Sequence, residues 1–315
     1  MTDTQNEVFK TPVNKIRLFE HGAPGSQNLK LTRKYYTEDM LDGRVKHIVQ
    51  NITDPDIVPY IPDGIGNSTD RQRIPAVLII PGGAFRRLVY NFEDVAKWLN
   101  SMGIAAFVLE CRLPSDEHDN AEDVPLIDAM RAMRVIRGRA QEFGIDEAKI
   151  GVMGFSAGGF IAALLSTAYE SDVYADYKYK DEYDKLSARP DFAVCSYPVI
   201  SIDDCIEAGK RYMSEEQVLE RISDGKAKIL HKYNPDKLVR PDMPPVFICE
   251  TDDDRTTLSE NSVGFYMAAR KAGVSAELHI FRTGGHGYGC GDDFAQTGEW
   301  KVLFTKWIKS IGIIS

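Results

Sequence analysis

The sequence lacks most of the features that would direct a chain to nucleic acid, to a membrane or to a disulfide-bonded fold. Its 315 residues carry 38 Lys and Arg against 47 Asp and Glu, a formal net charge of −9, with no basic run to offset it. This charge repels phosphate backbones and anionic lipids, so we expect no nucleic-acid partner. No 18 apolar residues follow one another, and residues 1–15 hold neither an apolar signal core nor a basic flank. The sequence therefore predicts a cytoplasmic protein without a membrane partner.

Cysteine is equally sparse and unpatterned. The five cysteines are odd in number and include no CxxC pair, which favours buried or idle thiols. Internal repeats and low-complexity tracts are also missing. With 43% hydrophobic residues the chain can bury a large core. We therefore expect one main domain over residues 56–315, preceded by an N-terminal extension, residues 1–55, with short strands at 15–20 and 29–36.

A regular alternation of strands and helices begins at residue 76. Short apolar runs with β-branched residues predict buried parallel strands at 76–80 and 103–110, and the apolar spacing over 126–143 predicts an amphipathic helix. The same alternation continues to a C-terminal helix at 300–308. The predicted fold class is α/β: a mostly parallel central sheet flanked by helices on both faces, with the functional loops at the C-terminal ends of the strands.

Two segments interrupt this alternation. Residues 169–189 are acidic and tyrosine-rich, and residues 202–243 form a long, mixed stretch with room for one or two helices. Each is interpreted either as a lid or rim over the substrate or as a surface excursion, because long surface insertions cost little entropy. The sequence leaves both alternatives open.

The strongest local signal is GFSAGG, residues 154–159, between an apolar strand and an apolar helix. A serine on such a sharp turn requires strained backbone angles, and its small neighbours let the strand and the helix approach each other. The turn exposes the Ser156 hydroxyl as a nucleophile. It also aims the amide of Ala157 at the place where an oxyanion would develop.

The second signal is PGGAF, residues 81–85, at the end of the first buried strand. Glycines here let backbone amides turn toward a ligand, as the other half of an oxyanion hole requires. Gly83 and Ala84 are the expected donors. The alternative interpretation is an ordinary tight turn.

A nucleophilic serine needs a base and an acid that orients the base. Among the six histidines only His286 lies on a glycine-rich loop, GGHGYG, that follows a strand. The acid is expected on the loop after the penultimate strand, which reads ETDDDR over residues 250–255. Asp254 is preferred there, and Asp253 is kept in reserve. A solvated acidic turn or a cation site is the alternative, but the spaced oxygen donors of a metal site are missing, so we expect no metal ligand.

Together these motifs resemble the α/β-hydrolases of the esterase/lipase group, close to the acetyl-xylan-esterase-like and hormone-sensitive-lipase-like carboxylesterases. The resemblance covers residues 56–308 and rests on PGGAF, GIAAFVLECRLP, GIDEAKIGVMGFSAGG, RPDFAVCSYPVIS, ETDDD and AELHIFRTGGHGYG. It implies a triad of Ser156, Asp254 and His286, since similar sequences carry a D-x-x-V-P acid turn whose first residue aligns with Asp254. The lipase-type HGG reads PGG here, and this proline is common in acetyl-xylan-esterase-like relatives, which favours carbohydrate esters.

The resemblance implies a serine carboxylesterase that hydrolyses short-chain, above all acetyl, esters on carbohydrates such as xylo-oligosaccharides through an acyl-enzyme. Such chemistry needs no cofactor and no metal, and the expected partner is a small-molecule ester. Formation of a homo-oligomer is left open. Two alternatives remain: a serine peptidase on small peptides, because the same triad cleaves amides, and a hydrolase-fold binding protein without turnover.

Overall fold

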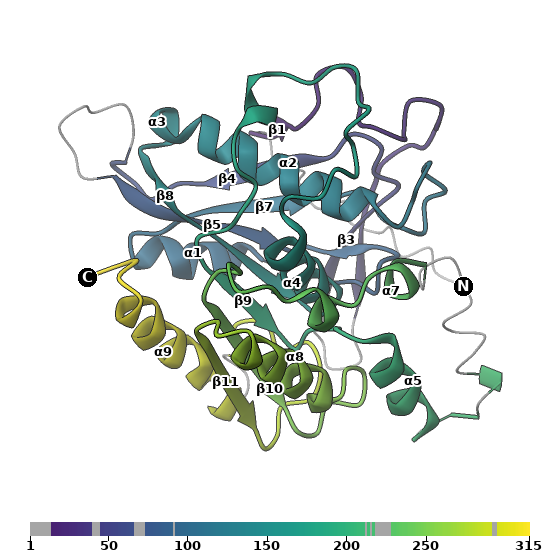
Figure 1. Ribbon diagram of the computed structural model, residues 1–315, viewed down its shortest axis with the longest axis vertical. Helices are drawn as coiled ribbons and strands as arrows, with labels where there is room; N and C mark the ends of the chain where they lie inside the picture. Colours follow the sequence, from purple (N-terminus) through teal and green to yellow (C-terminus); the bar gives the residue numbers. More distant parts are fainter. Residues whose placement is uncertain are drawn as a thin grey trace.

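The computed structural model describes residues 14–39, 45–65, 73–90, 92–211, 213–214, 216–217, 228–291 and 295–315. At its centre is an eight-stranded sheet (Figure 1). The strands follow one another across the sheet in the order β1 (Ile16–Arg17), β4 (Asp56–Tyr60), β7 (Ala105–Glu110), β5 (Ile74–Ile80), β8 (Ile145–Phe155), β9 (Ala193–Ser196), β10 (Val246–Thr251) and β11 (Ala276–Phe281).

Six neighbouring strands, from β7 to β11, run parallel, and β4 and β1 are antiparallel to the strands that they pair with. All six residues of β7 are buried, as are all six of β10, so these strands contact protein on both faces. Continuous apolar strands of this kind need helices on each side of the sheet. The α/β fold predicted from the sequence is confirmed.

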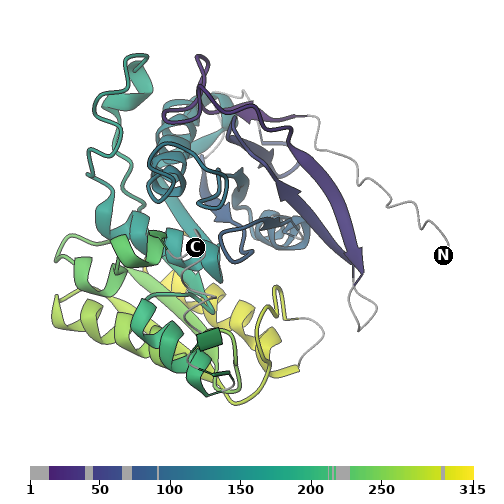
Figure 2. The ribbon, with the colours of Figure 1, turned by 90° about the vertical axis from the view of Figure 1, so that its right-hand side faces the viewer.

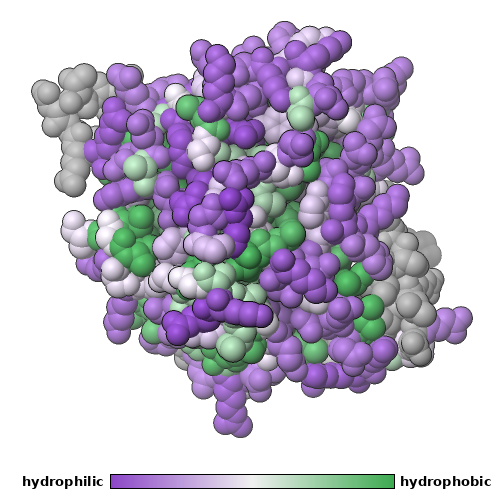
Figure 3. Space-filling view, viewed as in Figure 1, coloured by the Kyte–Doolittle hydropathy of each residue, from purple (hydrophilic) through white to green (hydrophobic). Residues whose placement is uncertain are grey.

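The helices cover both faces of the sheet. On one face α1 (Glu93–Ser101) packs on β7 and α9 (Ala295–Ser310) on β10 and β11, and the two helices meet where Trp98 and Trp300 stack edge to face with ring centroids 5.0 Å apart. The other face carries α2 (Val124–Gly138), α3 (Ala140–Phe143), α4 (Ala157–Ala168) and α8 (Ser259–Lys271). That face is mostly hydrophilic toward solvent, with hydrophobic areas between the hydrophilic residues (Figure 3).

A second, smaller sheet stands beside the main one (Figure 2). It joins β2 (Lys34–Asp39), β3 (Val45–Gln50) and β6 (Leu88–Val89), all antiparallel. The predicted strand at 29–36 corresponds to β2, which starts later, while the sequence analysis missed β3 altogether. Because only Arg86 and Arg87 separate β6 from the PGGAF loop, this sheet lies where it can reach the expected site.

The tyrosine-rich segment 169–189 packs against α2. Arg131 of α2 forms an ion pair with Asp184 at 3.1 Å, and the Tyr177 hydroxyl donates to the carbonyl of Gly22 at 2.8 Å. In Figure 2 this segment, coloured teal, lies on the opposite side of the molecule from the small sheet. The two interpretations of this segment from the sequence, a lid or rim and a surface excursion, both stay predictions.

The described part of segment 202–243 contains α5 (Ile202–Lys210), α7 (Lys228–Lys232) and a 3-10 turn at Pro235–Leu238. Helices therefore form within the described part of the stretch in which the sequence left room for them. Nowhere in the described ranges does a helix combine the length and the apolar character that crossing a membrane requires.

Candidate active site

Ser156 sits on the turn between β8 and α4 in a strained conformation. Its φ of 56° and ψ of −121° lie outside the regions that a non-glycine residue ordinarily adopts. Backbone contacts hold the residue there: its amide donates to the carbonyl of Ser196 at 3.0 Å, and its carbonyl accepts from the amide of Phe160 at 3.1 Å. The turn therefore has the geometry of a nucleophile elbow.

The glycines around Ser156 are required by close packing. A Cβ on Gly154 would lie 2.0 Å from the carbonyl oxygen of Gly158, and a Cβ on Gly158 would lie 2.1 Å from the carbonyl oxygen of Ile80. No side chain fits at either position without moving backbone. The mechanical reason that the sequence suggested for these glycines is thereby confirmed.

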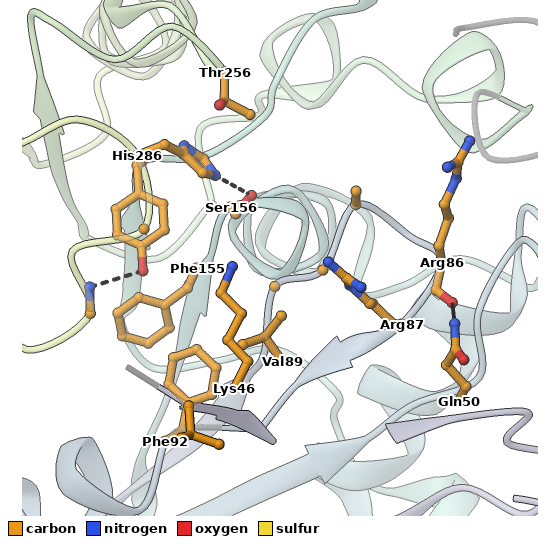
Figure 4. A pocket seen from close by; sticks show the side chains of 17 residues that line it. Lys46, Gln50, Arg86, Arg87, Val89, Phe92, Phe155, Ser156, Thr256 and His286 are labelled. Atoms are coloured by element: carbon orange, nitrogen blue, oxygen red, sulfur yellow. Dashed lines mark hydrogen bonds between the residues drawn. The ribbon is translucent and has the colours of Figure 1, made fainter. Parts of the chain in front are cut away.

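The structure brings Ser156, His286 and Asp254 together although they come from three separate loops, and Figure 4 shows the contact between the serine and the histidine. The Ser156 Oγ lies 2.8 Å from Nε2 of His286, and Nδ1 of His286 lies 2.7 Å from Oδ2 of Asp254. With Nδ1 protonated, the imidazole donates to the carboxylate and accepts from the hydroxyl. This arrangement can raise the nucleophilicity of the serine oxygen as a Ser-His-Asp triad does.

Asp254 is almost completely buried and remains an anion. Its Oδ1 accepts hydrogen bonds from the amides of Thr256 at 2.7 Å and Thr257 at 2.9 Å, and the Thr257 hydroxyl donates to Oδ2 at 3.0 Å. Burial raises the pKa of the carboxyl, but the hydrogen bond and charge of His286 together with these amides outweigh burial and hold the pKa below its usual range. A charged partner is thus available to the imidazole at neutral pH.

The neighbouring Asp253, the reserve choice from the sequence, has a different set of contacts. Its Oδ1 accepts from the amides of Gly284 at 2.9 Å and Gly285 at 2.8 Å, the two residues that precede His286. Thr251 adds a third tie, because its hydroxyl donates to the carbonyl of Gly285 at 3.0 Å. Sequence reasoning missed this anchoring of the histidine loop, which only the side-by-side placement of β10 and β11 creates.

The PGGAF loop passes directly against Ser156. A Cβ on Gly82 would lie 3.0 Å from the Cβ of Ser156, and a Cβ on Gly83 would lie 1.9 Å from the carbonyl oxygen of Arg87. Gly83 has a φ of 141° and Ala84 a φ of 56°, so this loop also departs from ordinary backbone angles. Gly82, Gly83 and Ala84 line the same cavity as Ser156 and His286, which places their backbone at the reacting end of the site.

Tyr197 supports the imidazole from the side. Its ring packs edge to face on His286, with centroids 5.0 Å apart, and its hydroxyl accepts from the amide of Gly289 at 3.3 Å. Burial raises the pKa of Tyr197, so the phenol remains protonated. Tyr197 directly follows the C-terminal end of β9, where functional residues are expected, but the sequence analysis did not single it out.

The residues of the site open into a cavity of about 670 Å³. Its walls come from the PGGAF loop, the elbow, the histidine loop and the small sheet. They are formed by Val45, Lys46, Gln50, Gly82, Gly83, Ala84, Arg86, Arg87, Val89, Phe92, Phe155, Ser156, Tyr197, Thr256, His286, Gly287 and Gly289. Among the described residues, none from segments 169–189 and 202–243 lines this cavity. The small sheet forms the part of the wall that these segments were expected to provide. The sequence analysis did not predict this.

Within the described residues, no group of three or more His, Cys, Asp or Glu side chains is arranged to hold a metal ion. The acidic turn at 252–254 instead uses two of its three carboxylates in hydrogen bonds to backbone amides. Two of the three aspartates of this turn therefore hold loop backbone in place: Asp254 holds its own loop and Asp253 holds the loop of His286.

The chain matches one protein family and is similar to a curated relative. Residues 65–268 match the model of the BD-FAE family. The chain is 30% identical over 240 residues to an acetylxylan esterase of Xylanibacter ruminicola, an alignment that covers 75% of this chain and 45% of that protein. The chain thus spans about half the length of this curated relative.

Solved structures with the same fold include a bifunctional hydrolase and a carboxylesterase. The acetyl ester-xyloside bifunctional hydrolase from Caldicellulosiruptor lactoaceticus is 37% identical, with 84% of this chain and 91% of that chain covered and a TM-score of 0.68. The carboxylesterase Cest-2923 from Lactobacillus plantarum is 19% identical, with 91% and 99% covered and a TM-score of 0.68, and shares the fold. The chain belongs to the BD-FAE family and is an α/β-hydrolase of the acetyl-xylan-esterase-like type.

Proposed function

We propose that the protein is a serine carboxylesterase that removes short acyl groups, above all acetyl, from carbohydrates such as xylo-oligosaccharides. The observation that carries the proposal is the continuous chain of contacts from Ser156 Oγ to His286 at 2.8 Å and from His286 to Asp254 at 2.7 Å. The names of the relatives support the substrate class, because one is an acetylxylan esterase and another is an acetyl ester-xyloside hydrolase.

In the proposed first step, Ser156 Oγ forms a bond to the carbonyl carbon of the ester while Nε2 of His286 takes the hydroxyl proton. The tetrahedral intermediate then breaks its bond to the alcohol oxygen, which receives the proton from His286. The acyl group remains on Ser156. Asp254 keeps the imidazole in the required tautomer and stabilises the imidazolium.

In the second step, a water molecule gives its proton to His286 as its oxygen attacks the acyl carbon. The bond to Ser156 Oγ breaks, the hydroxyl regains the proton and the free acid leaves. The oxyanion of both intermediates is held by the amide of Ala157, on the elbow, and by that of Gly83 or Ala84, on the PGGAF loop. Gly83 and Ala84 line the cavity beside Ser156 and Ala157 directly follows the serine, which supports this assignment.

The character of the cavity supports a short acyl group and a hydrophilic alcohol. A volume of about 670 Å³ is ample for a small sugar ester. Its larger aliphatic and phenyl side chains are Val45, Val89, Phe92 and Phe155, and most of the other residues that line it are polar residues or glycines. A fatty acyl chain would need a longer apolar channel.

Acetate release from acetylated xylo-oligosaccharides tests the proposal. We expect turnover by the wild-type protein, a fall of about 10⁴-fold or more in Ser156→Ala, and no change in the control Ser310→Ala on α9. An organophosphonate should label the peptide that contains Ser156. Preferential cleavage of an aminoacyl amide would favour a peptidase, and absence of both turnover and labelling would favour a binding protein. A cytoplasmic location stays a prediction from the sequence, and formation of a homo-oligomer stays open as it was there.

A further inference from the structure

The cavity carries a charge opposite to that of the whole chain. Lys46, Arg86 and Arg87 line it, and none of the described residues that form its walls is Asp or Glu. The chain as a whole has a formal net charge of −9. One carboxylate, that of Glu38, pairs with Arg87 and offsets one of these three positive charges. Because a cleft concentrates the field of the charges that line it, the remaining positive charge acts on any ligand that enters.

The backbone places these basic residues with little freedom. Lys46 belongs to β3, where it pairs in register with Glu38 of β2. Arg87 follows the PGGAF loop, and its amide donates to the carbonyl of Gly83 at 3.3 Å. The carbonyl of Arg86 accepts from Nε2 of Gln50 at 3.2 Å, which ties this loop to β3. The basic wall is therefore connected to the loop that borders Ser156.

The side chains differ in direction (Figure 4). Lys46 extends from the small sheet toward Ser156, and the guanidinium of Arg87 points toward the same part of the cavity, whereas Arg86 points away from the serine. Lys46 and Arg87 are consequently the two cations that a bound substrate would meet beside the reacting ester.

Arg87 is held in this orientation by one carboxylate. Its Nη1 lies 2.7 Å and 2.9 Å from the two carboxylate oxygens of Glu38. Both contacts use Nη1, so the guanidinium can present N–H groups of its other nitrogens to a ligand. A guanidinium fork oriented in advance, with a lysine beside it, is suited to a second carboxylate.

We infer that this wall, formed by Lys46 and Arg87, binds a carboxylate on the alcohol part of the substrate, so that the preferred ester is an acetylated oligosaccharide that carries an acidic, uronic-type sugar. The inference rests on the proposed function in one respect: an acetyl group has no place for a charge, so the carboxylate must belong to the sugar. The preference for acidic esters therefore depends on Lys46 of the small sheet and on Arg87, which follows the PGGAF loop. Neither residue belongs to the triad.

The test compares two acetylated xylo-oligosaccharides of equal backbone length, one with a single uronic acid branch and one neutral. We expect wild-type kcat/KM to favour the acidic ester by about tenfold, the effect of one or two partly exposed charged contacts. In Lys46→Gln with Arg87→Gln this ratio should fall to about one. Lys46→Arg, which keeps the charge, should retain the preference, and Lys34→Gln, at an exposed position of β2, should behave as wild type.

Salt provides an independent readout. Raising NaCl from about 0.05 M to about 0.5 M should reduce the preference in the wild type and leave the double variant unaffected, because exposed charge pairs are screened. Equal kcat/KM of the wild type on both esters, or equal losses on both in the double variant, would overturn the inference.

A binding measurement separates this inference from the proposed function. Calorimetry with Ser156→Ala and the deacetylated oligosaccharides should show tighter binding of the acidic form, whether or not the wild-type protein turns over either ester. If neither ester is hydrolysed but the acidic form binds more tightly, the proposed function fails and the anion site stands. If both forms bind equally, the anion site is wrong even where esterase activity is present.

Discussion

Asp253 and Asp254 are adjacent in the chain, yet their carboxylates hold two different parts of the same histidine loop. Oδ2 of Asp254 contacts Nδ1 of His286 at 2.7 Å, while Oδ1 of Asp253 accepts from the amides of Gly284 and Gly285. One aspartate orients the ring and the other fixes the backbone that carries it. From the sequence both positions looked suitable because they are neighbours in one acidic run, ETDDDR, on the expected loop.

The two aspartates should therefore respond differently to removal of charge. Asp254→Asn should lower kcat on p-nitrophenyl acetate by about 10³-fold to 10⁴-fold, because the amide favours the wrong imidazole tautomer. Asp253→Asn should lower kcat by about tenfold, since the loop loses a charge-assisted anchor but the triad keeps its members. The exposed Asp252→Asn is the matched control and should keep full activity. A larger loss in Asp253→Asn than in Asp254→Asn would reverse the assignment.

Gly83 should tolerate no side chain. Its φ is 141°, and a Cβ added there would lie 1.9 Å from the carbonyl oxygen of Arg87, so Gly83→Ala should displace the PGGAF loop. We expect kcat to fall by about 10²-fold or more and the free energy of unfolding to fall by about 1–3 kcal/mol. Gly264→Ala on α8 is the control: nothing lies within 4 Å of its added Cβ, so this change should stabilise the protein by about 0.5–1 kcal/mol. Urea unfolding and kcat together check both results.

Glu250 should make stability depend on pH. It is fully buried, and burial followed by the charge of Asp254 raises the pKa of its carboxyl well above the usual range. For an acid with a raised folded pKa, the stability contribution is fully present below the unfolded pKa of about 4.3 and is lost as pH rises through the folded pKa. Glutamine at this position has no proton to lose, so Glu250→Gln does not lose stability in this way. The free energy of unfolding of the variant minus that of the wild type should therefore increase as pH rises from about 4 to about 8.

Glu260→Gln is the control for Glu250→Gln and should show a slope of opposite sign, confined to pH values below about 4.3, with a flat profile from there to about pH 8. A hydrogen bond from its own backbone amide and the neighbouring Arg211 lower the pKa of Glu260. The contribution of such a group is present above the unfolded pKa and is lost as pH falls through the folded pKa. Urea unfolding of both variants at several pH values measures the two slopes. Parallel profiles for the two variants would contradict the prediction for Glu250.

The buried pair of Arg112 and Asp128 should contribute more to stability than an exposed pair does. Both side chains are fully buried, with Nη2 of Arg112 2.7 Å from Oδ1 of Asp128. Asp128→Ala leaves the guanidinium buried without its partner and should lower the free energy of unfolding by about 3–5 kcal/mol. Glu207→Ala, which removes an exposed partner of Lys210, should change it by less than about 0.5 kcal/mol. Chemical denaturation of both variants gives the comparison.

The parts of the site that local sterics dictate could be predicted from the sequence. The sequence predicts the elbow formed by Gly154, Ser156 and Gly158, because a strand that turns abruptly into a helix leaves no room for side chains beside the serine. The parallel strands are readable because a strand buried on both faces must be apolar throughout. The glycine-rich loop of His286 was identified in the same way, from the composition of a loop that follows a strand.

The tertiary structure decided everything that depends on which loops become neighbours. The choice between Asp253 and Asp254 follows from the register of β10 against β11, and a chain has no local signal for a register. The wall that contains Lys46 and Arg87 exists because β3 pairs with the distant two-residue strand β6, whose sequence pattern is too short to recognise. Local backbone strain and the burial of strands can be predicted from the sequence because they depend on neighbouring residues. Contacts between distant loops form only when the sheets assemble.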